Sequence, residues 1–183
     1  KWPGGKYRSR EKILATLIEG NRFIEPFVGS AAVFLNTGYK LNILADSNPD
    51  LILLYKQLRK DKEIFIDYTD SLFVSENNNE DNYYRFRDEF NDCKDKQRRA
   101  ALFIYLNRHC YNGLCRYNSK GIFNTPFGRY KEPRLPRNQM LHFIEASRLA
   151  SFECADYQDT MNKAEKGDVV YCDPPYVPLS ANS

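Results

Sequence analysis

The stretch RFIEPFVGSAAVFLNTGYKLNILAD, residues 22 to 46, decides the fold that we expect for this chain. Its first part, RFIEPFVG, predicts a strand that runs into a tight turn at Gly29. The apolar AAVFLN that follows favours a short helix, and LNILAD predicts a second strand that ends on Asp46. A strand, a glycine turn, a helix and a strand in this order form the repeating unit of Rossmann-like α/β folds with a parallel sheet.

The acid at the end of the second predicted strand points to a ligand. Asp46 lies seventeen residues beyond Gly29, close to the spacing at which an acid of a Rossmann-like unit hydrogen-bonds ribose hydroxyls. We therefore expect a nucleoside-bearing cofactor. The glycine signal itself is weak, because FVGSAA contains one glycine and no GxGxxG pattern, so a plain packing turn explains it equally well.

A later strand end carries the most unusual residues of the chain. VVYCDPPYVPLS, residues 169 to 180, begins like a strand that is covered on both faces and then reaches Asp173. Ligands bind at the carboxyl ends of strands in open α/β sheets. Pro174 and Pro175 lack backbone donors and restrict φ, so they make a stiff exit that orients side chains and carbonyls. We expect a positioned site here.

Between these two regions the pattern is mostly helical and too long for an ordinary crossover, so we expect an inserted domain. The expected fold class is α/β, with a partial Rossmann-like core of about four mostly parallel strands and a mainly helical insertion that carries a β-hairpin. The core is divided into residues 1–54 and 148–183, and the insertion covers residues 55–147. The elements that we predict besides the first unit are helices over residues 9–19 (capped by Ser9), 50–59, 63–73, 81–91 and 97–108, strands in SFECADY and GDVVYCD, and a hairpin between Cys115 and Phe127 with Ser119 to Gly121 at its tip.

The small net charge of +3 conceals a segregation of charge along the chain. Residues 61–93 hold three basic and ten acidic side chains, whereas residues 94–140 hold eleven basic and two acidic ones. A charge run is often only a solvated face, but here the basic residues alternate with aromatic residues and amides, as on nucleic-acid-binding surfaces. We therefore expect the second block to contact phosphates.

Length and composition exclude several classes of protein. With 183 residues, 42% of them hydrophobic, the chain can form a real core. It contains no run long enough to span a membrane and no signal-peptide pattern, so a cytoplasmic setting is expected. The five cysteines include no CxxC pair, which indicates reduced thiols rather than a disulfide framework. His109, Cys110 and Cys115 lack a fourth ligand at usable spacing, so no metal is expected.

The residues from Asp173 to Tyr176 suit one chemical task. An exocyclic amino group of a nucleobase is a poor nucleophile, because its lone pair is delocalised into the ring. The Asp173 carboxylate and the Pro174 carbonyl can accept its two N–H groups and free the lone pair for attack on an electrophilic methyl group. Tyr176 can stack on a base that is turned out of its duplex. On chemistry alone, a strand that ends in prolines beside an exposed acid explains the same residues equally well.

A series of motifs resembles one known family. KWPGGK, EPFVG, ADSNPDLI, NRHCYNGLCRYNSKGIFNTPFGRYKEP and DPPY, in this order, resemble the DNA adenine-N6 methyltransferases of the Dam type over nearly the whole chain. The resemblance implies a Rossmann-like methyltransferase core and methyl transfer from S-adenosylmethionine to adenine N6 in double-stranded DNA, within GATC. It also implies an enzyme that acts as a monomer on DNA, without a metal, in a bacterial or phage-infected cell.

The resemblance implies roles for the residues around the methyl donor. Trp2 would offer an aromatic surface near the sulfonium, and Lys6 a cation for the donor's carboxylate or for nearby acids. Gly29 would allow close backbone approach, and Asp46 would bind the ribose. The implied donor-binding residues are Trp2, Lys6, Phe27, Gly29, Asp46 and Asp173, and the implied catalytic residues are Asp173, Pro174, Pro175 and Tyr176.

The insertion would read the DNA sequence. Arg116 is implied to contact a guanine edge through two hydrogen bonds, and Lys1 is similar to the lysine that contacts the first guanine. Leu114 and Pro126 would supply apolar contacts, such as to a thymine methyl group.

Other residues of the insertion would position the duplex. Tyr111 and Asn112 are implied to enter the duplex near the target, where stacking is disturbed, and Tyr130 to stack or contact the backbone. The implied phosphate contacts, each of which is also explained by a solvated basic surface, are Arg87, Arg108, Asn118, Asn124 and Lys131.

Of the features that depart from the family pattern, two bear most on activity. Ala31 stands where the family's FxGxG pattern has its second glycine, and we expect its Cβ to crowd the donor or to force a backbone adjustment. The family's sheet continues past DPPY with three further strands, so the chain looks truncated at its C-terminus. We expect residues 1–183 alone to expose a sheet edge and to show poor stability and little activity.

Two alternatives stay open. The same acceptor geometry suits other amino groups, such as cytosine N4, RNA adenine or a protein glutamine. A DNA-binding, inactive relative is the second alternative, and Ala31 favours it. GGK at residues 4–6 also resembles the end of a phosphate-binding loop, but the earlier glycine is missing, which excludes an NTPase.

Overall fold

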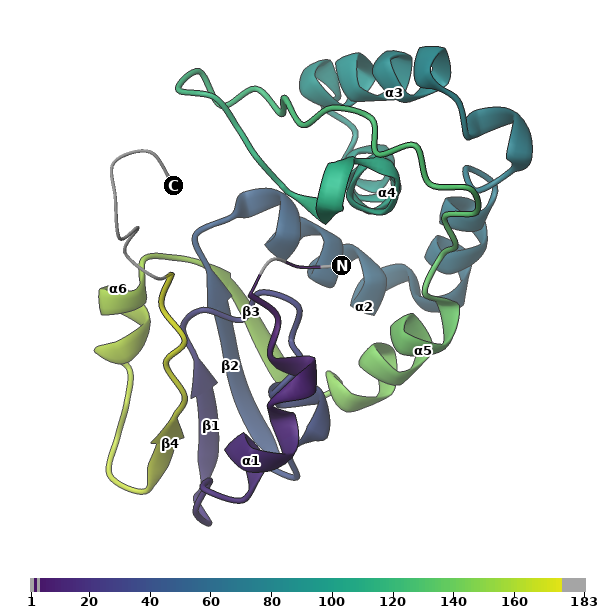
Figure 1. The fold of residues 1–183 in the computed structure, drawn as a ribbon. Helices are drawn as coiled ribbons and strands as arrows, with labels where there is room; N and C mark the ends of the chain where they lie inside the picture. Colours follow the sequence, from purple (N-terminus) through teal and green to yellow (C-terminus); the bar gives the residue numbers. More distant parts are fainter. Residues whose placement is uncertain (1, 3, 176–183) are drawn as a thin grey trace.

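The computed structural model describes residue 2 and residues 4–175, and a sheet of four parallel strands lies at its centre. The strands are β1 (Arg22–Glu25), β2 (Leu41–Asp46), β3 (Ala150–Cys154) and β4 (Asp168–Val170), in the spatial order β3-β2-β1-β4 (Figure 1). The α/β fold class and the parallel sheet predicted from the sequence are confirmed.

The order of the strands creates a switch point in the sheet. From β1 the chain moves through β2 to β3 in one direction, whereas β4 pairs with the opposite side of β1. At such a point, open α/β sheets leave a crevice outside the carboxyl ends of neighbouring strands, where ligands bind. Glu25 ends β1, and Asp173 lies three residues beyond β4, so both residues lie at this edge.

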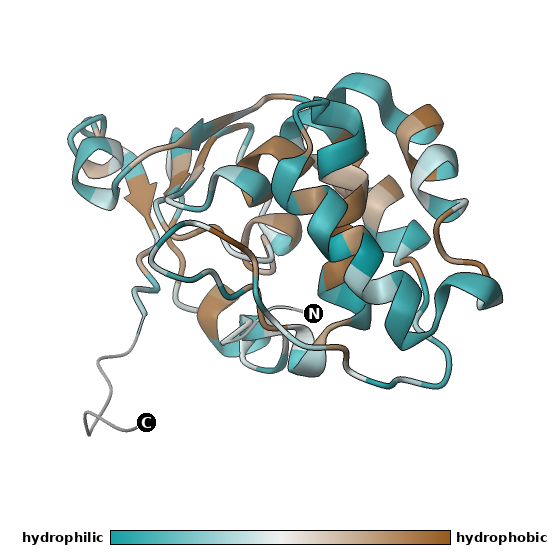
Figure 2. Cartoon of the chain, turned by 90° about the horizontal axis from the view of Figure 1, so that it is seen from above, coloured by the Kyte–Doolittle hydropathy of each residue, from teal (hydrophilic) through white to brown (hydrophobic). Residues whose placement is uncertain are grey.

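Burial explains why the apolar segments form central strands. Phe23 of β1 and Leu44 and Ala45 of β2 are completely buried, so both faces of the sheet are covered near its centre. α2 (Pro49–Asp70) packs against β2 and β3, and α5 (Arg137–Ala146) packs against α2. Seen from above, hydrophobic residues concentrate in the strands and in the inner helices, and hydrophilic residues along the outer helices (Figure 2).

α2 contains a kink that separates the two helices predicted in this region. Lys62 has φ 49° and ψ −127°, which lie outside the helical region, so the helical hydrogen bonding is interrupted there. Asn48 caps the start of α2, because its side-chain oxygen accepts from the backbone N–H groups of Asp50 and Leu51. The second part ends at Asp70 rather than at the predicted residue 73.

The other two helices predicted in the insertion, over residues 81–91 and 97–108, are present to within one residue at each end. α3 (Glu80–Asp92) and α4 (Lys96–His109) pack against each other, and α4 also packs against α2. Asn79 caps α3 and Asp95 caps α4, because their side-chain oxygens accept N–H groups of the first turn.

The helix predicted from residue 9 onward is shorter than expected. α1 spans Arg10–Leu14 and follows a 3-10 turn, η1 (Lys6–Arg8). The hydroxyl of Thr16 donates to the carbonyl of Ile13, and this local bond competes with continuation of the helix. Ser9 occupies the N-cap position, as predicted, but its side chain makes no capping hydrogen bond.

Several short elements complete the fold. The AAVFLN segment forms a 3-10 helix, η2 (Phe34–Asn36), rather than an α-helix. The sequence did not predict α5 or the short α6 (Tyr157–Met161), which is capped by the preceding residue, Asp156. Two further 3-10 turns are η3 (Ser75–Asn77) and η4 (Tyr111–Gly113).

Residues 115–127 form the predicted hairpin, which we call the insertion hairpin. Tyr117 and Phe123 form an antiparallel bridge, and at the tip the N–H of Gly121 donates to the carbonyl of Asn118. The tip therefore lies where the sequence predicted it. The bridge between Tyr117 and Phe123 is the one β-bridge within residues 115–127, because turn residues dominate the segment.

The predicted boundary between residues 54 and 55 falls inside α2. This helix contacts β2 and β3 as well as α4, so one continuous element joins the sheet to the insertion. The division into a two-part core and an insertion stays a prediction.

The helices, the potential metal ligands and the cysteines bear on the class of protein that the sequence predicts. Within residues 4–175 and residue 2, no helix is both long and apolar enough to cross a membrane. The same part of the chain contains no group of three or more His, Cys, Asp or Glu side chains that could hold a metal ion. All five cysteines are free thiols, as predicted.

Candidate functional site

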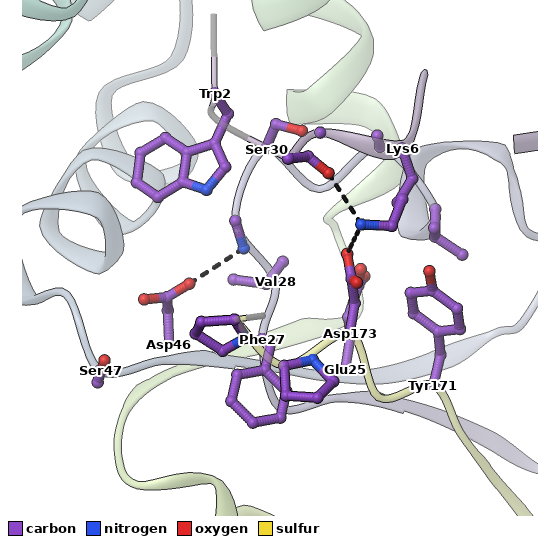
Figure 3. Close-up of a pocket in the computed structure, with 17 residues that line it drawn as sticks. Trp2, Lys6, Glu25, Phe27, Val28, Ser30, Asp46, Ser47, Tyr171 and Asp173 are labelled. Atoms are coloured by element: carbon purple, nitrogen blue, oxygen red, sulfur yellow. Dashed lines mark hydrogen bonds and ion pairs between the residues drawn. The ribbon is translucent and has the colours of Figure 1, made fainter. Parts of the chain in front are cut away.

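A pocket of about 450 Å³ opens at the carboxyl ends of β1, β2 and β4. The structure brings all the predicted donor-binding positions to its wall, although they come from distant parts of the chain (Figure 3). Pro174 and Pro175 also line it, whereas Tyr176 lies outside the described residues. The predicted residues that line the pocket are Trp2, Lys6, Phe27, Gly29, Asp46, Asp173, Pro174 and Pro175.

The glycine turn after β1 is shaped by a close contact with Trp2. Gly29 has φ +43°, which L side chains rarely adopt, and a Cβ added there would lie 2.8 Å from Nε1 of Trp2. The hydroxyl of Tyr55 donates to the carbonyl of Gly29. The turn therefore requires glycine for its conformation and for the space that the indole occupies.

Asp46 connects this turn to the start of α2. Its Oδ2 accepts from the N–H of Gly29 at 3.1 Å (Figure 3). Its Oδ1 accepts from the N–H of Asn48 at 2.9 Å. Burial raises the pKa of the Asp46 carboxyl, and these two hydrogen bonds oppose the rise because they favour the charged form. Since each oxygen has further lone pairs, the carboxyl can still accept from a ligand hydroxyl at the pocket.

Asp173 is held at the pocket by an ion pair with the N-terminal segment. Nζ of Lys6 lies 2.7 Å from Oδ2 of Asp173, and it also donates to the carbonyl of Gly4 at 2.9 Å (Figure 3). The N–H of Tyr171 donates to the carbonyl of Ile24, so β1 still holds the chain just beyond the end of β4. These contacts give the acid that follows β4 a defined place.

Glu25 is a pocket residue that the sequence reasoning missed. It is only 3% exposed, and its Oε2 has no hydrogen-bond partner among the described residues. Burial raises the pKa of its carboxyl well above the usual range; the N–H of Phe34 opposes this, and the charges of Asp173 and Asp46 raise it further. Its place as the last residue of the first strand was the available signal, because strand ends are where ligands bind.

Ala31 does occupy a conformation that favours glycine. Its φ is 57°, and its side chain is completely buried in the apolar core instead of lining the pocket. The Cβ is therefore accommodated by the left-handed backbone and the core, and it does not narrow the pocket.

The insertion hairpin brings two predicted DNA-binding residues into contact. Nε of Arg116 donates to Oδ1 of Asn124 at 2.9 Å, and its Nη2 donates to the carbonyl of Asn124 at 3.3 Å. The Arg116 side chain is exposed, so its guanidinium lies on the surface in a fixed orientation. Asn118 uses its Oδ1 to accept from the N–H groups of Lys120 and Ile122, and thus shapes the hairpin tip.

A second group of predicted DNA-binding residues lies around η4. Tyr111 is 53% exposed, and Asn112 has a left-handed φ of 53°. The N–H of Asn112 donates to the hydroxyl of Tyr130 at 3.1 Å, so these two predicted residues are joined. Leu114 is half-buried and Pro126 is exposed next to this turn. The structure therefore gathers one aromatic and apolar patch from two segments.

The predicted phosphate contacts are more scattered. Arg87 on α3 lies over the ring of Tyr84 at 4.6 Å, and Arg108 on α4 donates to the carbonyl of Arg134 at 2.9 Å. Lys131 is exposed. Lys1 lies outside the described residues.

The α/β fold, with its sheet of four parallel strands and the pocket at the switch point, is consistent with the core of a methyltransferase. The profile of the D12 class N6 adenine-specific DNA methyltransferases matches residues 2–183, so the chain belongs to this family.

Bacterial proteins resemble the chain over its whole length. A DNA adenine methylase of Serratia marcescens is 54% identical over 183 residues, which are 100% of this chain and 68% of that protein. The DNA adenine methylases of Escherichia coli K12 and of Vibrio cholerae are 50% and 45% identical, again over the full chain and 66% of each relative. The chain thus spans about two thirds of the length of these relatives.

Proposed function

We propose that the protein transfers a methyl group from S-adenosylmethionine to N6 of adenine in double-stranded DNA, with GATC as the target sequence. The observation that carries the proposal is that Asp173, Gly29 and Asp46 line one pocket at the switch point of the sheet. Family membership and the names of the relatives support adenine in DNA as the substrate.

The residues of the pocket suit S-adenosylmethionine, which supplies an electrophilic methyl group when bound. Glu25, Asp46 and Asp173 place three carboxyl groups in a wall whose one described cation is Lys6, so the pocket favours a ligand with positive charge. Asp46 has remaining acceptor capacity for ribose hydroxyls. The buried, unpartnered Oε2 of Glu25 also calls for a polar ligand group.

Asp173 and Pro174 would prepare the adenine for reaction. The Asp173 carboxylate would accept one N–H of the amino group, and the Pro174 carbonyl would accept the other. Both acceptors follow a strand of the sheet, and Lys6 orients the carboxylate, so little reorganisation would be needed during the reaction. Adenine must leave the duplex to reach this pocket, which is a property of enzymes that act on bases.

The insertion would bind the duplex. Residues 94–140 carry the excess of basic side chains, and Arg116 lies exposed on the insertion hairpin. A guanidinium in this setting can contact the O6 and N7 atoms of guanine through two hydrogen bonds. The exposed side chain of Tyr111 and the neighbouring Asn112 would occupy the space that the target base leaves in the stacked duplex.

The decisive experiment incubates the full-length protein with labelled donor and with duplexes that differ only at one GATC. We expect label in the duplex with GATC and little in the altered one. Asp173→Ala should reduce transfer at least about a hundredfold while DNA binding is retained. Asp159→Ala, which changes an exposed acid on α6, is the control. If wild type binds DNA without any donor-dependent product, the protein is a binding module instead.

The proposal includes the cellular setting and the state of assembly. We propose a cytoplasmic protein of a bacterial or phage-infected cell, because the relatives named above are bacterial. One chain carries both the pocket and the basic insertion, which supports action as a monomer on DNA. Light scattering of the protein with and without a duplex measures the assembly.

A further inference from the structure

A buried charge network joins the donor pocket to the insertion hairpin. Its centre is Asp50 in the first turn of α2, which contacts Arg99 of α4 and Tyr117 of the hairpin. We propose that Tyr117 is a positioning residue that couples donor binding to DNA recognition. This inference rests on the proposed function, because it concerns the same two ligands.

The network is compact and well paired. The side chain of Asp50 is only 5% exposed. Its Oδ1 accepts from Nε of Arg99 at 2.5 Å, and its Oδ2 accepts from Nη2 of Arg99 at 3.1 Å. Oδ2 also accepts from the hydroxyl of Tyr117 at 2.7 Å. Arg99 therefore already balances the buried charge with a two-point contact.

Tyr117 thus has a role other than charge balance. Burial raises the pKa of its phenol, and the charge of Asp50 raises it further, so the hydroxyl stays protonated and donates. Because Arg99 already pairs with the Asp50 carboxylate, the hydrogen bond from the neutral Tyr117 hydroxyl mainly fixes the orientation of the two side chains and adds little charge compensation. The contact fixes one arm of the hairpin to the first turn of α2.

On one side, the network continues to the pocket through hydrogen bonds between alternate residues of the chain, Asp50, Asn48 and Asp46. The backbone N–H of Asp50 donates to Oδ1 of Asn48 at 3.0 Å, and the N–H of Asn48 donates to Oδ1 of Asp46 at 2.9 Å. Asp46 accepts in turn from the N–H of Gly29, which lines the pocket. A donor that contacts Asp46 or the glycine turn would bias the position of this segment.

On the other side, the network reaches the residue proposed to read guanine. Tyr117 follows Arg116 directly and forms an antiparallel bridge with Phe123. The side chain of Asn91 on α3 makes two hydrogen bonds with the backbone of Phe123. Its Oδ1 accepts from the N–H of Phe123 at 2.9 Å, and its Nδ2 donates to the carbonyl of Phe123 at 3.2 Å. One arm of the hairpin is therefore attached to α3, and the other arm is attached to α2 through Asp50.

This arrangement predicts reciprocal coupling between the two ligands. If the donor orders the segment from Gly29 to Asp50, the hairpin arm that carries Arg116 is ordered with it, and DNA bound to the arm favours the same segment. By linkage, each ligand must then raise the affinity for the other by the same factor. Without the Tyr117 hydroxyl, the segment and the arm can move more independently.

The test compares Tyr117→Phe with wild type in the full-length protein. The probes are S-adenosylhomocysteine, which cannot transfer a methyl group, and a GATC duplex. The dissociation constant of S-adenosylhomocysteine is measured with and without saturating duplex, and the ratio is the coupling factor. The control is Tyr105→Phe, because it also removes one tyrosine hydroxyl, which donates to the carbonyl of Asn77 instead of to Asp50.

We expect a coupling factor of about five or more in wild type and at least a threefold lower factor in Tyr117→Phe. The affinity for S-adenosylhomocysteine alone should stay within about twofold. As a second measurement, the amides of the hairpin should exchange more slowly when S-adenosylhomocysteine binds wild type, but not Tyr117→Phe.

Other outcomes overturn the inference. These are a coupling factor of one in wild type, an unchanged factor in Tyr117→Phe, or an equal loss in Tyr105→Phe, which would indicate a general loss of stability. If wild type binds neither S-adenosylhomocysteine nor the duplex, the proposed function itself is wrong, and that result is distinct from a loss of coupling.

Discussion

Nζ of Lys6 lies 2.7 Å from Oδ2 of Asp173, although the two residues lie near opposite ends of the described chain. Both side chains are about one fifth exposed, at 20% and 22%. The ion pair is therefore partly shielded from water, and it lies beside the glycine turn that Trp2 contacts (Figure 3). The ion pair fixes the N-terminal segment against the residues that follow β4. It also orients Asp173, which is proposed to bind the target amino group.

We predict that Lys6→Met slows methyl transfer more than it weakens donor binding. Without the ammonium group, the Asp173 carboxylate loses the partner that orients it, and small errors of position cost about a hundredfold in rate. Single-turnover transfer and donor binding are measured separately. Lys6→Arg should recover much of the rate, because it can still pair with Asp173. A Lys6→Met protein with the wild-type rate would contradict an orienting role.

We predict that Gly29→Ala impairs donor binding. The left-handed φ of +43° costs an L residue about 1–2 kcal/mol, and the new Cβ would lie 2.8 Å from the indole of Trp2. Donor affinity should fall about tenfold, as measured by calorimetry. Gly38→Ala is the matched control, because a Cβ at Gly38 would have no atom within 4 Å and its φ is not left-handed. Similar losses in both variants would show a general effect of alanine.

We predict that Glu25→Gln stabilises the fold at alkaline pH and weakens donor binding. The pKa of Glu25 is raised in the folded protein, so the folded state binds more protons than the unfolded state above the ordinary glutamate pKa. Its stabilising contribution is thus present at low pH and is lost as pH rises through the folded pKa. Glutamine removes this loss, but a bound cationic donor could then no longer lower the pKa of a carboxyl at this position and pair with its charge, at a cost of about tenfold in affinity.

Urea unfolding from pH 5 to 9 tests the first part of that prediction, and donor titration tests the second. Glu63→Gln, which changes an exposed acid of α2, is expected to alter neither property. A Glu25→Gln protein with the wild-type pH dependence of stability would show that burial does not raise the pKa of the Glu25 carboxyl.

The sequence sufficed for the parts of the fold that depend on local pattern. The strands that end at Glu25 and Asp46 are short apolar runs bounded by turns, and their burial on both faces matches that pattern. The capping residues Asn79 and Asp95 each lie two residues before a predicted helix start, so local chemistry also set those boundaries.

The rest depends on contacts between distant residues. The ion pair between Lys6 and Asp173 and the bond from Tyr117 to Asp50 each join segments whose proximity no local pattern reveals. Glu25 was missed because its importance comes from burial, which places an unpartnered oxygen beside other acids. The order of the motifs predicted the pocket residues as one group, but only the tertiary structure shows that they face one cavity.

We predict that Arg116→Ala relaxes sequence discrimination. Asn124 fixes the guanidinium on the hairpin surface, so its loss should cost about 1–3 kcal/mol on the GATC duplex and much less on other sequences. Lys131→Ala, which changes an exposed lysine, should weaken binding to all duplexes alike and lower the salt dependence. Fluorescence anisotropy with matched and mismatched duplexes separates these outcomes, and an equal effect of both variants would refute direct reading by Arg116.

The last prediction concerns acid stability and His109. This residue is 1% exposed, it stacks on Tyr105 at 3.8 Å, and its Nδ1 lies 2.8 Å from the carbonyl of Tyr105. Since the carbonyl can only accept, Nδ1 carries the proton in the neutral ring. Burial lowers the pKa of His109 from 6.5 to about 4, and the carbonyl opposes this in part. Between these values the unfolded chain binds more protons than the folded protein, so stability falls as pH falls from 6.5 to about 4.

The loss across this window should reach about 3 kcal/mol, since one pKa unit corresponds to about 1.4 kcal/mol. Urea unfolding at a series of pH values measures it. His109→Gln should lower stability at pH 7, because the aromatic stack is lost, yet it should flatten the slope between pH 6.5 and 4. His142→Gln, which changes an exposed histidine on α5, should leave the slope as in wild type. If His109→Gln keeps the full slope, other groups cause the acid sensitivity. The pKa of His109 would then be the same in the folded and the unfolded protein.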